Sequence, residues 1–314
     1  MARLNTPIRT FGDHEANISA VAVFPDRQRI VTGSGDKTLR LWDLKTGTML
    51  KKMEGHQTNV NALAVAQNGK LIASGDESGE VIAWHGETGD SLTLAVIKAH
   101  NSSISSLDFS PDGSVLATGS SEDKTKLWGT TAWHLQGKLN CGADVSCVRY
   151  SPAGAGELLA IASSNQIEIW NPRTERLVAL LKGHESYALS LVWTPDGTRL
   201  LSAGDSYDPT IREWDTSTWN QVGPPWEGHT EDITSLAVNA SGTIVASASI
   251  DNYICIWQLP LPPVNLKHTS SVQCVAFSMD GKHILSGGSD NKISEWAVSH
   301  KQVAQDSTDL KVTV

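Results

Sequence analysis

The chain has 314 residues, with 25 Lys and Arg against 34 Asp and Glu and a formal net charge of -9 at pH 7. Because no dense run of basic residues accompanies this acidic balance, the electrostatic footprint of a nucleic-acid-binding protein is missing. The N-terminus lacks the apolar core of a signal peptide and no run of about 18 apolar residues could span a bilayer, so we expect a soluble protein without a membrane partner.

A motif of twelve residues recurs along the chain and indicates its organisation. Its first copy, TGSGDKTLRLWD over residues 32–43, combines alternating small and apolar residues, a Gly/Asp turn and an apolar run that ends in Trp-Asp. The tryptophan recurs with gaps of 42, 44, 42, 44, 43 and 39 residues, at Trp42, Trp84, Trp128, Trp170, Trp214, Trp257 and Trp296. This period is typical of a propeller blade with four short strands. The sequence therefore predicts an all-β fold: a seven-bladed β-propeller of four-stranded antiparallel blades, as one domain over residues 1–298.

The N-terminal segment has a place in this scheme. Residues 7–13 (PIRTFGD) resemble the segment that precedes Gly-His in later units, such as TMLKKMEG before His56. If that segment is an outer strand, Ile8 to Phe11 completes the blade whose inner strands come last. We therefore expect the ring to be closed by N-terminal strand pairing with the last blade, which removes unpaired sheet edges. Residues 299–314 are polar and are expected to form a C-terminal tail.

Three more strands are predicted within each unit. The first alternates apolar residues and ends at a turn such as SPDG at Ser110 or TPDG at Thr194. In these turns Pro and Asp preset the bend and Gly tolerates a positive φ. The second strand leads to a turn that carries Asp, and the third strand carries the Trp. No stretch of the chain has the pattern of a helix.

A histidine in most units is followed 18 residues later by Ser or Thr, and 28 residues later by the Trp except in the fifth unit. Each histidine belongs to a different blade, so the pattern favours buried hydrogen-bonded networks over a metal site. We predict no metal and no cofactor. The complete sets, including the turn Asp, are His14, Thr32, Asp36 and Trp42; His184, Ser202, Asp208 and Trp214; His229, Ser247, Asp251 and Trp257; and His268, Ser286, Asp290 and Trp296.

With Gly-His, the Asp turn and Trp-Asp in this order, the chain resembles the WD-repeat (β-transducin-like) family over nearly its whole length. Repeats such as GPPWEGHTEDITSLAV and SPDGSVLATGS are also similar to those of fungal WD-repeat arrays, including arrays attached to NACHT-type NTPases. The P-loop motif of an NTPase does not occur in this sequence. The resemblance implies a platform without chemistry of its own, so we expect that the protein is not an enzyme. It also implies that partners dock on the face formed by the Gly-His loops and the Asp turns.

Three units depart from the pattern. The second has Ser78 and the third has Glu122 where the turn Asp is expected. The fourth keeps only Trp170, with Cys141-Gly142 in place of Gly-His and an unusual SPAGAGE turn. We therefore expect fewer buried hydrogen bonds to hold the fourth blade, which makes it the weak point of the ring.

A candidate binding surface follows from the variable residues of these loops. Aromatic and acidic residues gather on the fifth and sixth units, whereas the other loops mainly offer Ser, Thr, Asn and Gly. Exposed aromatics are frequent binding anchors, and carboxylates beside aromatic ring faces suit Lys or Arg. The alternative is an ordinary surface on which three of the four tyrosines fall by chance. The predicted partner-binding residues are Tyr187, Asp205, Tyr207, Glu231, Asp232, Ile250 and Tyr253.

Two classes of function remain. The first is a non-catalytic scaffold or adaptor, monomeric by itself, that binds a protein or peptide of basic character. The second is a small-ligand-binding or catalytic propeller, but the sequence has no GxSxG or HExxH motif and no carboxylate pair outside ordinary turns. We expect the first class, in the cytoplasm or the nucleus. Four cysteines without CxxC spacing fit such a reducing compartment.

Overall fold

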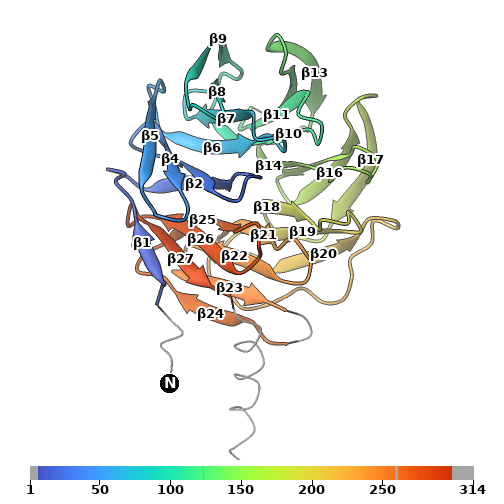
Figure 1. The fold of residues 1–314 in the computed structure, drawn as a ribbon. Helices are drawn as coiled ribbons and strands as arrows, with labels where there is room; N and C mark the ends of the chain where they lie inside the picture. Colours follow the sequence, from blue (N-terminus) through green and yellow to red (C-terminus); the bar gives the residue numbers. More distant parts are fainter. Residues whose placement is uncertain (1–5, 123, 259–260, 299–314) are drawn as a thin grey trace, which may run out of the picture.

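The computed structural model describes residues 6–122, 124–258 and 261–298, and in these residues the chain forms strands and turns. The strands make seven small antiparallel sheets that follow one another around a ring (Figure 1). The predicted all-β, seven-bladed propeller is therefore confirmed. None of the described segments contains a helix long and apolar enough to cross a membrane. The predicted C-terminal tail, residues 299–314, lies outside the described residues.

The blades are numbered from the N-terminus, and the first strand of each lines the centre of the ring. Blade one contains β2 (Ile18–Val23), β3 (Arg29–Ser34), β4 (Thr38–Asp43) and β5 (Met49–Glu54); blade two contains β6 (Val60–Val65), β7 (Leu71–Asp76), β8 (Glu80–His85) and β9 (Ser91–Lys98). Blade three contains β10 (Ile104–Phe109), β11 (Val115–Ser120), β12 (Lys124–Gly129) and β13 (His134–Asn140); blade four contains β14 (Val145–Tyr150), β15 (Leu159–Ser163), β16 (Gln166–Asn171) and β17 (Arg176–Lys182). Blade five contains β18 (Ala188–Trp193), β19 (Arg199–Gly204) and β20 (Ile211–Asp215); blade six contains β21 (Ile233–Val238), β22 (Val245–Ser249), β23 (Tyr253–Trp257) and β24 (Val264–Lys267). Blade seven contains β25 (Val272–Phe277), β26 (His283–Gly288), β27 (Ile293–Ala297) and β1 (Arg9–Phe11).

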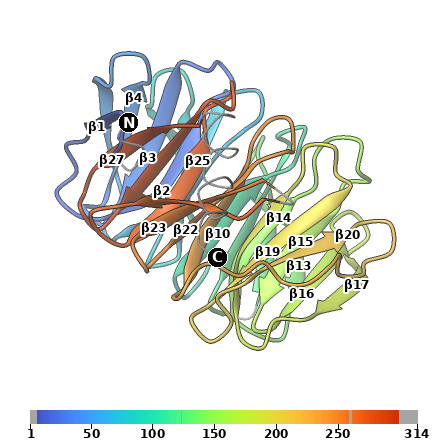
Figure 2. The same cartoon turned by 90° about the horizontal axis from the view of Figure 1, so that it is seen from below.

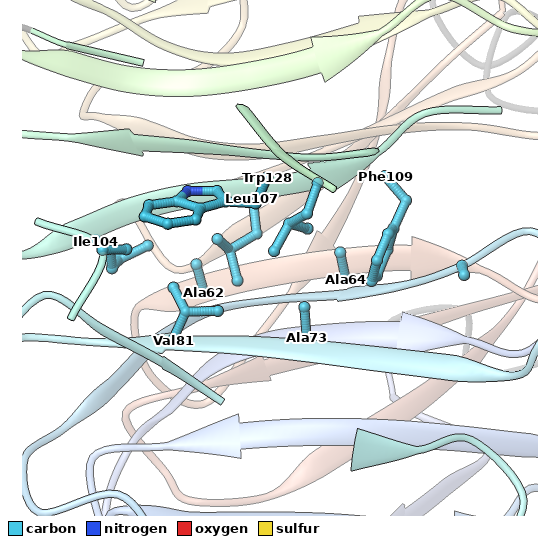
Figure 3. Close-up of a cluster of buried hydrophobic side chains, with 11 residues drawn as sticks. Ala62, Ala64, Ala73, Val81, Ile104, Leu107, Phe109 and Trp128 are labelled. Carbon is cyan, nitrogen blue, oxygen red and sulfur yellow. The ribbon is translucent and has the colours of Figure 1, made fainter. Parts of the chain in front are cut away.

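The hydrophobic core is divided among the gaps between neighbouring blades. Between blades two and three, Ala62 and Val81 meet Leu107, Phe109 and Trp128 in one buried cluster (Figure 3). Because each sheet is covered on both faces, the middle strands are near-continuous runs of apolar and small residues rather than alternating ones. The second strand of blade two, LIASGD, is buried at every position after the first.

The N-terminal strand closes the ring, as predicted. β1 pairs with β27 in antiparallel register, with Arg9 opposite Glu295 and Phe11 opposite Ile293. Figures 1 and 2 both show β1 beside β27. The contact extends into blade one, because the Phe11 ring meets the Trp42 ring edge-on at a centroid distance of 5.6 Å. The first and the last strand of the described chain therefore share one blade, and β1 covers the edge of β27.

Blade five differs from the predicted four strands. Its sheet has three strands, and the outer position is occupied by residues 221–226, which pair through only two isolated bridges, Ile211 with Trp226 and Trp214 with Gln221. This segment contains Pro224 and Pro225. Proline has no N–H to donate to a ladder, so the outer segment cannot pair continuously.

Candidate interaction surface

Two kinds of connection share one face of the ring, which we call the upper face: the loops before the first strands and the turns between the second and third strands. Neighbouring strands are antiparallel, so these connections lie at the same end of the sheet, and all other turns lie on the opposite, lower face. Backbone hydrogen bonds join the two kinds of connection within a blade. Gly35 N–H donates to Asn17 O at 3.0 Å, and Glu77 N–H donates to Asn59 O at 2.9 Å.

A buried polar set ties the upper connections of blade one to its strands. His14 Nδ1 lies 2.7 Å from Asp36 Oδ2, His14 Nε2 lies 2.8 Å from Thr32 Oγ1, and Trp42 Nε1 donates to Thr32 Oγ1 at 2.9 Å. Burial lowers the pKa of His14 despite the neighbouring carboxylate. Burial alone would raise the pKa of Asp36, but hydrogen bonds from Thr38, His14 and the Glu15 amide lower it to about 2. The carboxylate is therefore charged, and it fixes the loop to the turn.

The same chain of bonds occurs in blades five and six. His184 Nδ1 is 2.8 Å from Asp208 and His184 Nε2 is 2.8 Å from Ser202, which accepts from Trp214 at 2.9 Å. In blade six the corresponding bonds join His229 to Asp251 and to Ser247, each at 2.7 Å, and Trp257 to Ser247 at 2.8 Å. The loops beneath the predicted binding residues are thus anchored to the core.

Blades two and three also have an acidic partner for their histidines, where we expected a departure. In blade two the acid is Asp76, two residues before Ser78, and its Oδ2 lies 2.9 Å from His56 Nδ1. Asp76 is the last residue of β7, and its other oxygen accepts a 2.7 Å bond from the Ser78 hydroxyl. In blade three Glu122 replaces Asp and lies 2.6 Å from His100 Nδ1.

The set of blade seven is incomplete, which corrects the prediction for His268. Trp296 Nε1 donates to Ser286 Oγ at 2.9 Å, but His268 Nε2 has no partner among the described residues. His268 Nδ1 lies 3.9 Å from Asp290 Oδ2, beyond hydrogen-bond length. Instead, the Thr269 hydroxyl donates a hydrogen bond to Asp290 Oδ2 at 2.7 Å. The competing hydroxyl therefore separates His268 from the network.

Blade four has a different buried set, built on Glu168, a residue that we did not single out from the sequence. Trp170 Nε1 donates to Glu168 Oε2 at 2.7 Å, and Ser163 Oγ and Gln166 Nε2 donate more weakly to Oε1, at 3.4 and 3.3 Å. Burial raises the pKa of Glu168, and burial with the nearby Glu168 charge raises the pKa of Cys141 to about 12. Cys141 is thus an unreactive thiol at neutral pH.

One difference from the other blades could have pointed to Glu168 from the sequence: an acidic residue stands where blade one has a basic one. By strand register it stands opposite Ile161, whereas the matching residue of blade one, Arg40, stands opposite Thr32. Arg40 Nη2 lies 3.6 Å from the Asp36 carboxylate in its own blade. Blade four lacks both the hydroxyl acceptor and the turn acid, and a negative side chain at this place supplies the acceptor that Trp170 needs.

The predicted binding residues of blades five and six form one continuous stretch of the upper face, which we call the ledge. Asp205 N–H donates to Tyr187 O at 3.1 Å, and Ile250 N–H donates to Asp232 O at 3.1 Å. The two blades are joined by Ser206 N–H, which donates to Asp232 Oδ1 at 2.7 Å. Six of the seven predicted residues therefore lie on loops that are linked by hydrogen bonds, namely Tyr187, Asp205, Tyr207, Glu231, Asp232 and Ile250.

Exposure divides the ledge into contact residues and supporting residues. Tyr207 is 81% exposed, Tyr187 45% and Ile250 38%. Glu231 is also exposed, whereas Tyr253 is half-buried and packs against the core cluster between blades five and six. Three side chains and the Glu231 carboxylate are thus available to a partner.

Asp205 is not available, which corrects our prediction that it offers a carboxylate. It is 8% exposed, and its oxygens accept bonds from the Ser186 hydroxyl at 2.7 Å and from the Tyr207 amide at 3.1 Å. Asp205 therefore holds the long turn of blade five in place. Its neighbour Tyr187 lines the central cavity of the ring, which has a volume of about 630 Å³, so the ledge borders this cavity.

Six segments of the chain match the family model described as WD domain, G-beta repeat: residues 5–43, 47–85, 92–129, 175–215, 221–258 and 263–296. Together these segments cover well over half of the chain. The stretch between the third and fourth matches, residues 130–174, contains most of blade four, which is the blade without a histidine set.

Relatives match the chain over different lengths. It is 27% identical over 92% of its length to nuclear distribution protein PAC1 of Arthroderma otae, and it covers 60% of that protein. It is 26% identical over 64% of its length to a guanine nucleotide-binding protein subunit beta of Zea mays, of which it covers 57%. To apoptotic protease-activating factor 1 of Rattus norvegicus it is 32% identical over 46% of its length, and it covers 12% of that protein. The chain thus spans less than two thirds of the length of these relatives.

Proposed function

Since this chain belongs to the WD-repeat family, we propose that it is a non-catalytic scaffold that binds a protein or peptide segment at the ledge of blades five and six. The observation that carries the proposal is the exposure of Tyr207, 81%, on loops that are otherwise held by hydrogen bonds. A large aromatic side chain on a rigid support loses little conformational freedom when a partner covers it. Such residues are the usual anchors of protein interfaces.

The partner segment that suits the ledge is basic. Glu231 and the free oxygen of Asp232 are negative, and the ring faces of Tyr187 and Tyr207 attract cations. A cation placed over an exposed tyrosine ring gains about 0.5 to 2 kcal/mol, depending on how far water is excluded. A Lys or Arg side chain can therefore contact a ring and a carboxylate together. The relatives support a role in assemblies, because one of them is named as a subunit.

Binding of defined peptides tests the proposal. An array of Lys- and Arg-containing peptides is probed with the purified protein, and the affinity of the strongest peptide is measured by calorimetry. The double variant Tyr207→Ala, Glu231→Lys should weaken this affinity at least about tenfold, because it removes an aromatic anchor and reverses a charge. Asp232 is left unchanged, since its side chain supports the Ser206 amide.

The matched control is Glu77→Lys, which makes the same charge reversal on the same face in blade two, where the Glu77 amide binds Asn59 O. This variant should bind the peptide with nearly the wild-type affinity. Equal affinities for the double variant and the wild type would reject the ledge as the binding site. A loss of equal size in Glu77→Lys would show that the net charge of the face, rather than the ledge, attracts the peptide.

A further inference from the structure

A cavity of about 220 Å³ opens on the lower face between blades three and four. Its walls are the turn that begins at Ser110, the outer strand of blade three near Gly137, and the turn from Pro172 to Glu175. Tyr150 of β14 also lines it. This volume is below the range of about 300 to 1,000 Å³ that holds drug-sized ligands, so the cavity fits a group no larger than a side chain or a small metabolite.

The sequence of blade four explains why this gap is not filled. Glu175 precedes the outer strand and has a positive φ of 52°, and Trp133 and Trp219 occupy the same place in blades three and five with φ of 51° and 59°. Both tryptophans pack against the core clusters of their blades, whereas Glu175 is exposed and carries no ring. The space that an indole fills in the neighbouring blades therefore stays open.

A proline keeps the same turn away from its own blade. In blade three Thr130 N–H donates to Ser114 O at 2.9 Å, and in blade five Thr216 N–H donates to Thr198 O at 3.2 Å. The matching residue of blade four is Pro172, which has no N–H to donate. The bond that fastens this turn in other blades cannot form here.

One polar group that lines the cavity has no hydrogen-bond partner among the described residues. Tyr150 is 8% exposed, and among the described residues its hydroxyl makes no hydrogen bond. Tyr150 takes the strand position of Phe109, so packing alone does not need the hydroxyl. A buried hydroxyl normally finds an acceptor or donor. Because Tyr150 lines the cavity, its hydroxyl can bond a ligand or water there.

The remaining lining combines apolar and acidic side chains. Val115 and Leu127 supply apolar surface, and Asp112, Glu157 and Glu175 supply three carboxylates. Arg173 Nη2 donates to Glu157 Oε1 at 2.8 Å, and Asp112 accepts from the hydroxyls of Ser110 and Ser114, at 2.6 and 2.8 Å. In the described part of the chain Glu175 has no ion pair or hydrogen bond of its own. The uncompensated charge of the cavity is therefore negative.

We propose that this cavity binds an organic cation of side-chain size: an ammonium or guanidinium group on an aliphatic stem. The stem lies along Val115 and Leu127, the Glu175 carboxylate is the counter-ion, and the Tyr150 hydroxyl accepts a hydrogen bond from the cation. A Lys or Arg side chain of a partner protein and a free small amine share this chemistry. The site is on the face opposite the ledge and does not depend on the function proposed there.

Ligand-observed saturation-transfer NMR with the full chain tests the site. The probes are n-butylammonium and n-butylguanidinium, with n-butanol as the uncharged analogue. Both cations should receive saturation, and n-butanol should receive much less. The reason is that the carboxylates attract the charged group, whereas n-butanol offers the cavity only its aliphatic stem and an uncharged hydroxyl. Glu175→Gln and Tyr150→Phe should each weaken cation binding about three- to tenfold. Tyr150→Phe restores the residue found in blade three, so its melting temperature should stay near that of the wild type.

Glu77→Gln on the upper face is the matched control for the loss of one negative charge, and it should leave cation binding unchanged. The proposal is overturned if neither cation binds, if n-butanol binds as well as the cations, or if both lower-face variants bind like the wild type. N-acetylarginine methylamide separates the two sources: binding as tight as that of n-butylguanidinium supports a protein side chain, and weaker binding supports a free small cation.

Discussion

Ser247 and Ser286 occupy the same buried place in blades six and seven, but only Ser247 is bonded to the histidine of its blade. Ser247 Oγ lies 2.7 Å from His229 Nε2 and accepts from Trp257 Nε1 at 2.8 Å. Ser286 Oγ accepts from Trp296 Nε1 at 2.9 Å, donates weakly to Ser294 O at 3.5 Å and makes no bond to the histidine of its blade. Ser→Ala at the two positions removes the same atom from equally buried sites. The pair of variants therefore isolates what the histidine link contributes.

The expected magnitudes follow from the groups that lose a partner. A buried polar group left unpaired costs about 1 to 3 kcal/mol. Ser247→Ala unpairs an imidazole nitrogen and an indole N–H, so the free energy of unfolding should fall by about 2 to 4 kcal/mol. Ser286→Ala unpairs the indole and removes only a long bond to Ser294 O, so it should cost about 1 to 2 kcal/mol. Urea unfolding at pH 7, followed by tryptophan fluorescence, measures both losses.

Equal losses in the two variants would refute the reasoning, because either the histidine link of blade six contributes nothing to stability or His268 is bonded to Ser286 after all. A larger loss for Ser286→Ala would be a stronger contradiction, since that site lacks the bond to a histidine. The comparison also tests whether His268 is separated from its network in solution. If it were bonded to Ser286 there, the two substitutions should have similar effects.

Two other predictions concern closure of the ring and acid stability. Deleting residues 1–12 removes β1 and uncovers the edge of β27, so the melting temperature should fall strongly in calorimetry; unchanged melting would contradict closure by the N-terminal strand. Burial lowers the pKa of His14, His56, His100, His184 and His268 below the ordinary value of 6.5. As the pH falls, the unfolded chain therefore takes up protons at these histidines before the folded chain does. The free energy of unfolding should decrease as the pH falls below 6.5. Urea unfolding at pH 7 and pH 5 measures this change, and equal stability at the two values would contradict it.

The sequence predicted the ring because equal local patterns give equal local structure. The regular tryptophans, the Pro-Asp-Gly turns and the 18-residue spacing from His14 to Thr32 all concern residues within one blade. Closure of the ring by Ile8 to Phe11 could also be predicted, because this segment resembles the outer strands that precede Gly-His in later units. Periodicity thus carries the fold of a repeat protein almost completely.

The details of the polar sets depend on competition that spacing cannot express. Asp76 reaches His56 from the end of a strand, although a pattern match looks for the acid two residues later, at Ser78. Thr269 captures the Asp290 carboxylate, although His268 stands at the expected place. In both cases the partner is decided by which polar atoms meet in space, and several short side chains can satisfy one carboxylate.

The ledge shows the same limit on prediction. The sequence placed the aromatic residues of blades five and six on one face, and the loop hydrogen bonds join them. It could not distinguish Asp205, whose carboxylate accepts hydrogen bonds within the turn, from Glu231, which is exposed. An acidic residue next to an extended turn serves the turn first, because backbone amides there need acceptors.

Blade four changes both faces of the ring through a few linked substitutions. Without the histidine loop and the hydroxyl opposite Glu168, the Trp170 indole is paired by a buried carboxylate, so the charge at that place is the reverse of Arg40 in blade one. On the lower face of the same blade, Pro172 stands where blades three and five have a backbone N–H donor, and Glu175 stands where they have an indole. These two residues line a cavity of negative charge. Packing alone does not explain the Tyr150 hydroxyl, because Phe109 fills the same strand position in blade three without one. The departures of blade four therefore support a binding role for its lower face.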